Sequence, residues 1–200
     1  MTGGASDFDF YSGAAAMPPN PALLAVGAVG ATPRHAAAAP KGWAKVHEGG
    51  LLVFKAPAPA PRALFVTAAR AGSPEEVLAA VRAPGFEPSK LVWLDDGAAA
   101  SFPKSRGSAR IAADGANAVV VETVADGPGW LVLLDNWYPG WEATVDGAPA
   151  RVRRADYAFR AVEVPAGRSV TRFDYRPGSL GLGLMLALFA APALLAAAFL

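Results

Sequence analysis

The most constraining feature of this sequence is a regular alternation of short apolar segments with glycine- and proline-rich turns between residues 110 and 177. The segments recur at roughly 8–12 residues, a spacing that is typical of all-β sandwiches. The turn sequences are Asp126-Gly127-Pro128-Gly129, Pro139-Gly140, Asp146-Gly147 and Pro165-Ala166-Gly167. The pattern predicts a mainly β fold, with an antiparallel, jelly-roll-like β-sandwich over residues 110–177.

The stretch from Asp135 to Gly147 (DNWYPGWEATVDG) is the centre of this pattern. Proline presets φ and glycine accepts a positive φ, so Pro139-Gly140 predicts a sharp structural turn. Asp146-Gly147 is a dipeptide that two-residue hairpin loops prefer, because both central residues need φ > 0. Residues 141–145 between these turns alternate apolar and polar side chains, as one strand of a half-buried sheet does.

The rest of the chain divides into regions of different composition. Residues 1–42 are rich in Ala, Gly and Pro and are expected to be loosely ordered. Residues 43–97 read as an α+β subregion of short strands with one short helix over 74–83, because Ser73 suits an N-cap and the following proline suits the first helical turn. Residues 98–109 are small and polar, and we expect them to form a mobile loop.

Composition excludes several function classes. The chain has 18 basic and 17 acidic residues, a formal net charge of +1, so no nucleic-acid partner is expected. It has no cysteine, which excludes disulfides and thiolate metal sites. His35 and His47 are isolated, and no phosphate-binding loop, dinucleotide fingerprint or nucleophile elbow occurs. We therefore expect no metal and no cofactor.

The C-terminal segment, residues 179–200, predicts a transmembrane α-helix. From Leu180 to Leu200 it carries no charged side chain, and a helix of this length would span about 30 Å, the thickness of the hydrocarbon core of a bilayer. A buried core helix is the alternative interpretation. The predicted partner is then a lipid bilayer, in which the chain has a single C-terminal span.

Several motifs in the C-terminal half resemble those of the YfhO-like bacterial membrane proteins, relatives of the GT-C glycosyltransferases that use lipid-linked sugars. The matching elements, in the same order and spacing, are Tyr138-Pro139-Gly140-Trp141, Val145-Asp146-Gly147, residues 157–160, residues 164–167 and Tyr175-Arg176-Pro177. Weaker similarity occurs upstream at Pro61-Arg62-Ala63 and Phe86-Glu87-Pro88.

The resemblance implies an extracytoplasmic β-rich domain next to the last span of a large multi-spanning protein. It also implies that the catalytic apparatus lies in a part of the protein that is absent here. We therefore expect the chain to be a fragment or a split partner that works with a multi-spanning membrane partner or a missing N-terminal membrane region. The basic residues before the predicted span would by themselves favour a cytoplasmic domain, so the two indications of orientation conflict.

Three aromatic residues, Trp137, Tyr138 and Trp141, are candidates for contact with an envelope glycan, since flat rings suit the apolar faces of sugars. The alternative is that Trp141 belongs to the core and that the other two rings brace the turn.

The acids nearest this region, Asp135, Glu142, Asp146 and Asp174, have no spacing that fixes a catalytic pair, so no catalytic residue is predicted. A glycosidase would need two such acids facing each other across one cleft.

Arg172 and Arg176 lie close to the predicted span and are candidates for contact with lipid headgroups or a lipid-linked phosphate. The alternative is a solvated strand face with acidic partners. The predicted function is a membrane-anchored accessory domain that supports glycosyl transfer to envelope polymers. An anchored structural or interaction domain unrelated to sugar transfer is the alternative function.

Overall fold

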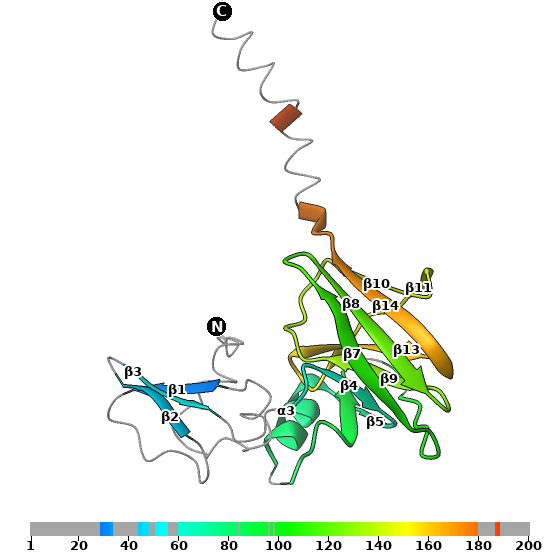
Figure 1. Cartoon of the computed structure of the whole chain (residues 1–200). Coiled ribbons are helices and arrows are strands. Elements are labelled where there is room, and N and C mark those ends of the chain that lie inside the picture. The colour runs from blue at the N-terminus through cyan, green and yellow to red at the C-terminus, as the bar shows by residue number, and fades with distance from the viewer. Residues whose placement is uncertain are drawn as a thin grey trace, which may run out of the picture.

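The computed structural model describes residues 29–33, 44–48, 51–55, 60–83, 85–95, 97, 99–179 and 187–188. Most of its elements are β-strands, which form a five-stranded, a six-stranded and a three-stranded sheet. The two larger sheets pack face to face (Figure 1) through a shared apolar core. The expected mainly β fold is therefore present, but three strands of the six-stranded sheet come from residues 63–94, upstream of the predicted sandwich over residues 110–177.

The five-stranded sheet is entirely antiparallel. Its strand order is β11 (Ala148–Ala150), β10 (Trp141–Val145), β14 (Gly167–Tyr175), β8 (Ala118–Ala125) and β7 (Gly107–Asp114). Buried and exposed residues alternate along β14, as expected for a sheet with one face on the core and one in solvent. The same alternation of apolar and polar residues is visible in the sequence, which is why this strand could be predicted.

The six-stranded sheet is covered on both faces. Its strand order is β4 (Ala63–Val66), β9 (Gly129–Leu133), β13 (Phe159–Val164), β12 (Arg153–Ala155), β6 (Leu91–Leu94) and β5 (Ala68–Ala71). Leu131 and Leu133 of β9 face the five-stranded sheet, whereas Trp130 and Val132 pack in a second apolar cluster on the other face. Continuous burial explains why β9 is apolar throughout.

One strand pair in this sheet is not antiparallel, and both of its strands lie in the predicted α+β subregion, residues 43–97. Strands β5 and β6 are parallel, and the helix α3 (Pro74–Arg82) connects them. A parallel pair requires such a crossover, because its strands run in the same direction. Ser73 caps α3 by accepting a hydrogen bond from the Glu76 N–H, and the Glu76 side chain accepts one from the Ser73 N–H.

The outer edge of β5 is covered by the segment that was expected to be a loop. The Ser101 hydroxyl accepts a hydrogen bond from the Ala69 N–H (2.9 Å) and donates one to the Ala69 carbonyl (3.0 Å). The Phe102 N–H donates to the Thr67 carbonyl, and the Trp130 indole donates to the Ala100 carbonyl. The loop ends at Gly107, where β7 begins.

The three-stranded sheet is antiparallel, in the order β1 (Val29–Pro33), β3 (Leu51–Lys55) and β2 (Ala44–Glu48). Strand β1 lies in the region that the composition predicts to be loosely ordered. The rest of that region, residues 1–28 and 34–42, lies outside the described residues.

The predicted fold class needs one correction, which concerns the C-terminal transmembrane helix. Among the described parts of the chain, no helix is both long enough and apolar enough to cross a membrane. The prediction used only the apolar composition and the length of the segment. These two properties do not by themselves establish that a helix forms. Of the predicted span, residues 180–186 and 189–200 lie outside the described residues.

The turns around β10 have the backbone that their sequence predicts. Asp146 and Gly147 have φ values of 51° and 82°, and they connect β10 to β11. Gly140 has a φ of 105°, and a Cβ there would lie 3.0 Å from the Tyr175 ring. Pro139-Gly140 therefore lets the chain pass close to Tyr175 as it enters β10.

Candidate functional site

A pocket of about 440 Å³ lies at the end of the sandwich where β7 ends and β8 and β10 begin. Segments far apart in the sequence form it: the residue before β4, the β7–β8 turn, the segment after β9, the start of β10 and one residue of β13. The lining residues are Arg62, Gly115, Ala116, Val119, Leu134, Asp135, Asn136, Tyr138, Trp141 and Arg160. Positively charged, acidic, amide and aromatic side chains thus meet in one hollow.

Asp135 is the centre of an ion-pair network in this pocket. It accepts hydrogen bonds from Arg62 Nε (2.6 Å) and Nη2 (2.8 Å) and from Arg160 Nη2 (2.8 Å). Arg62 Nη1 also donates to Asp114 Oδ2 (2.5 Å) at the outer rim. The hydrogen bonds to Asp135 and then to Asp114 hold the pKa of the Arg62 guanidinium above its usual value. Two cations therefore share one carboxylate at the inner end of the pocket.

Arg160 is almost completely buried, with 2% of its surface exposed. Its guanidinium carbon lies 3.6 Å from the centre of the Trp141 ring and 5.6 Å from that of Phe173, so the cation stacks on aromatic faces. Burial lowers the pKa of this guanidinium, and the charge of Asp135 opposes that shift. Nε and Nη1 of Arg160 and Nε1 of Trp141 have no hydrogen-bond partner among the described residues.

Two of the three predicted aromatic residues belong to the pocket. Tyr138 and Trp141 pack edge to face at 6.1 Å, and Tyr175 contacts both rings at 5.1 and 5.2 Å. Tyr138 is 43% exposed and forms the accessible part of this aromatic cluster. An exposed ring beside fixed polar groups is suited to contact with a ligand.

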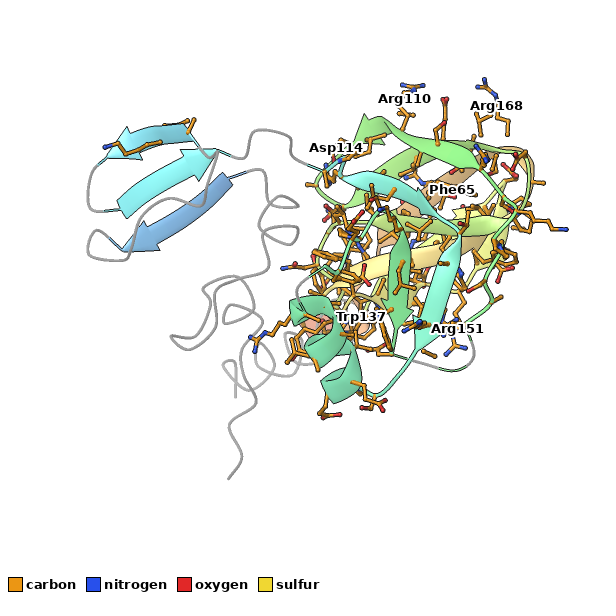
Figure 2. The ribbon with its side chains drawn as sticks, turned by 90° about the horizontal axis from the view of Figure 1, so that it is seen from below. Phe65, Arg110, Asp114, Trp137, Arg151 and Arg168 are labelled. Carbon is orange, nitrogen blue, oxygen red and sulfur yellow. The ribbon has the colours of Figure 1, made fainter. Side chains whose placement is uncertain are left out.

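Trp137, the third predicted aromatic residue, lies elsewhere. Its ring packs against the guanidinium of Arg154 at 5.7 Å, and its backbone N–H donates to the Ala158 carbonyl (2.6 Å). Figure 2 shows Trp137 well separated from Asp114, which pairs with the pocket residue Arg62. The structure therefore places Trp137 with Arg154 and not with Tyr138 and Trp141.

Arg172 and Arg176, the predicted contacts for lipid or phosphate, both have acidic neighbours. Arg172 donates three hydrogen bonds to Asp174, from Nε to both carboxylate oxygens (2.8 and 3.0 Å) and from Nη2 to Oδ1 (2.7 Å). This pairing lowers the pKa of the Asp174 carboxyl. Arg176 Nη1 lies 3.8 Å from Glu142 Oε2. Contact of either arginine with a lipid headgroup stays a prediction.

The four acids near the turn lie in three different places. Asp135 lines the end pocket, whereas Glu142 and Asp174 line a second hollow of about 360 Å³ on the other side of Trp141. Asp146 accepts a hydrogen bond from the Val170 N–H (2.8 Å) within its turn. Glu142 and Asp174 are neighbours on adjacent strands, and each has an arginine partner.

A buried acid outside the pocket has unusual electrostatics. Asp156 is fully buried, with a φ of 47°, and its Oδ1 accepts a hydrogen bond from the Trp93 N–H (2.7 Å). Its own N–H donates to the Trp93 carbonyl. Burial raises the pKa of the Asp156 carboxyl to about 8, and the Trp93 N–H only partly offsets that shift. The acid form of Asp156 therefore predominates at neutral pH.

The described residues hold no group of three or more His, Asp or Glu side chains that could bind a metal ion. Arg62, Asn136 and Arg160 were not predicted to lie beside the aromatic residues of this site. Arg160 carried a usable signal, since it is a charged residue within the apolar run of β13 and such residues are rarely buried without a partner. Its partner, 25 positions away, could not be read from local spacing.

Comparison of the chain with protein-family models, curated proteins and solved structures finds no match. The resemblance to the YfhO-like proteins therefore stays a prediction that depends on the motifs quoted above. The pocket geometry is the firmer basis for a functional proposal.

Proposed function

We propose that this chain is a non-catalytic saccharide-binding domain and that the end pocket is its binding site. The observation that carries the proposal is the position of Tyr138, whose exposed ring lies beside the fixed Arg62–Asp135–Arg160 network. Saccharides have apolar faces that stack on such rings and hydroxyl groups that bond with planar polar side chains. The volume of about 440 Å³ falls within the range of about 300–1,000 Å³ that is common for small-ligand sites.

We further propose that this binding serves glycosyl transfer to envelope polymers, with the domain as an accessory to a multi-spanning membrane protein. The support for this role is the resemblance of the Tyr138–Trp141 motif and its neighbours to the YfhO-like family. Fixed ion pairs around the pocket suit a domain that positions a glycan, because a rigid site loses little entropy when it binds. The reaction itself would take place on the partner.

The test is a titration of the full chain with a panel of neutral and acidic oligosaccharides, followed by calorimetry and tryptophan fluorescence. We expect binding to weaken roughly 2- to 13-fold in Tyr138→Ala, because an aromatic contact of this kind contributes about 0.5–1.5 kcal/mol. Trp137→Leu is the matched control, since its ring lies outside the pocket.

Equal losses in the two variants would contradict the assignment of the end pocket. If the folded wild-type chain binds no saccharide in the panel, the proposal is wrong, and a structural or interaction domain is the better interpretation. Thermal unfolding of each variant separates loss of binding from loss of fold.

A further inference from the structure

Three buried hydrogen-bond donors beside the end pocket have no acceptor among the described residues. Arg160 Nε, Arg160 Nη1 and Trp141 Nε1 are all buried nitrogens without a partner among the described residues, and all three belong to the stacked pair below the pocket. These nitrogens are closed off from the pocket, so a ligand acts on Arg160 through its charge and not through a direct hydrogen bond. A negative charge close to Arg160 would offset part of the cost of burying that guanidinium.

The charges at this end of the pocket also favour an anionic ligand. Arg62 and Arg160 both bind the carboxylate of Asp135, so two guanidinium groups lie next to each other with one carboxylate between them. Arginine presents a planar fork of donors that matches a carboxylate. From the donors and the charges together, and on the basis of the proposed function, we infer that the bound saccharide carries a carboxylate, as a uronic acid does.

Asp114 shows where such a group would bind. Its carboxylate accepts a single hydrogen bond from Arg62 Nη1 at the rim, and its side chain is 53% exposed. An exposed carboxylate held by one contact is easily displaced, because a surface ion pair contributes little. The carboxylate of the saccharide would replace Asp114 at Arg62 and bring a negative charge toward Arg160.

The test compares three matched ligands: methyl glucuronide, methyl glucoside and methyl glucoside 6-phosphate. Each is titrated into the full chain at low ionic strength, with binding followed by calorimetry and by NMR of the ligand. We expect the glucuronide to bind about fivefold more tightly than the glucoside, because an ion pair at a partly exposed guanidinium contributes up to about 1 kcal/mol. The preference should shrink as salt is added.

Three variants locate the effect. Arg62→Gln should bring the affinities of the glucuronide and the glucoside to within about twofold of each other. Asp114→Asn should tighten glucuronide binding and leave glucoside binding unchanged, because it removes a competing charge from an exposed position. Arg172→Gln is the control, since Arg172 does not line the pocket and should keep the wild-type preference.

The outcomes separate this inference from the proposed function. Equal binding of the glucuronide and the glucoside would overturn the inference and leave saccharide binding intact. Tight binding of the phosphate ligand alone would overturn the choice of a carboxylate. An unchanged or weaker glucuronide affinity in Asp114→Asn would also count against the inference. Absence of binding by all three ligands, together with a silent oligosaccharide panel, would instead remove the proposed function.

Discussion

Two arginine–aspartate pairs in this protein differ in burial, and we therefore expect them to differ in their contribution to stability. Arg160 pairs with Asp135 across 25 positions and is almost fully buried against Trp141, whereas Arg172 pairs with Asp174 two residues away and is about half exposed. A buried pair lies in a medium of low dielectric, in which a lost partner leaves a charge that water cannot solvate. An exposed pair exchanges its partner for water at little cost. Burial therefore decides which of the two pairs the fold depends on.

The largest expected effect follows from breaking the buried pair. Asp135→Ala removes the carboxylate that Arg62 and Arg160 share, so the charge of Arg160 remains buried without compensation. We expect the free energy of unfolding to fall by about 3–5 kcal/mol, as measured by urea denaturation. A loss no larger than that of an exposed pair would show that the network is not structural.

Asp156 sharpens the comparison, because it is a buried acid with no arginine partner among the residues that the structure describes. Its folded pKa of about 8 lies above its unfolded value of 3.8, so its stabilising contribution is complete below pH 4 and is lost as the pH rises toward 8. The free energy of unfolding should fall by about 3–4 kcal/mol between pH 5 and pH 8 from this group alone.

Asp156→Asn is the matched variant for this pH dependence. Asparagine tolerates a φ of 47° and keeps the acceptor for the Trp93 N–H, but it does not titrate. Urea denaturation at pH 5, 6.5 and 8 should show a much flatter profile in the variant. A profile as steep as that of the wild type would assign the pH dependence to other groups.

The smallest effect is expected for the exposed pair. Arg172→Ala should leave the urea midpoint unchanged within experimental scatter, and high salt should not alter that result, because the wild-type pair is already in contact with solvent. A clear drop in the midpoint would mean that this face of the five-stranded sheet is covered in solution.

The same contrast explains what the sequence could predict. Arg172 and Asp174 lie two residues apart, so strand periodicity places them on one face. The Asp146-Gly147 turn and the Ser73 cap of α3 are equally local, and the structure contains both. The partners of Asp135 lie 73 and 25 positions away, and no spacing rule connects residues that meet only after two sheets have packed.

Other differences have a similar cause. The parallel pairing of β5 with β6 and the burial of both faces of the six-stranded sheet depend on how α3 and residues 99–105 cover that sheet. A continuous apolar run such as β9 fits a buried strand or a buried helix equally well. Of the candidate site, Tyr138 and Trp141 were recognisable from residue type, whereas their separation from Trp137 required the fold.

The hydroxyl of Ser101 has a consequence for how this protein behaves in a crowded solution. Peptide groups along a free sheet border invite a strand from a neighbouring molecule, and such pairing can continue into aggregates. At Ala69 both the amide and the carbonyl of that border are already engaged by Ser101. A foreign strand would have to displace this contact before it could add to the sheet, so the molecule is protected from polymerising at that border.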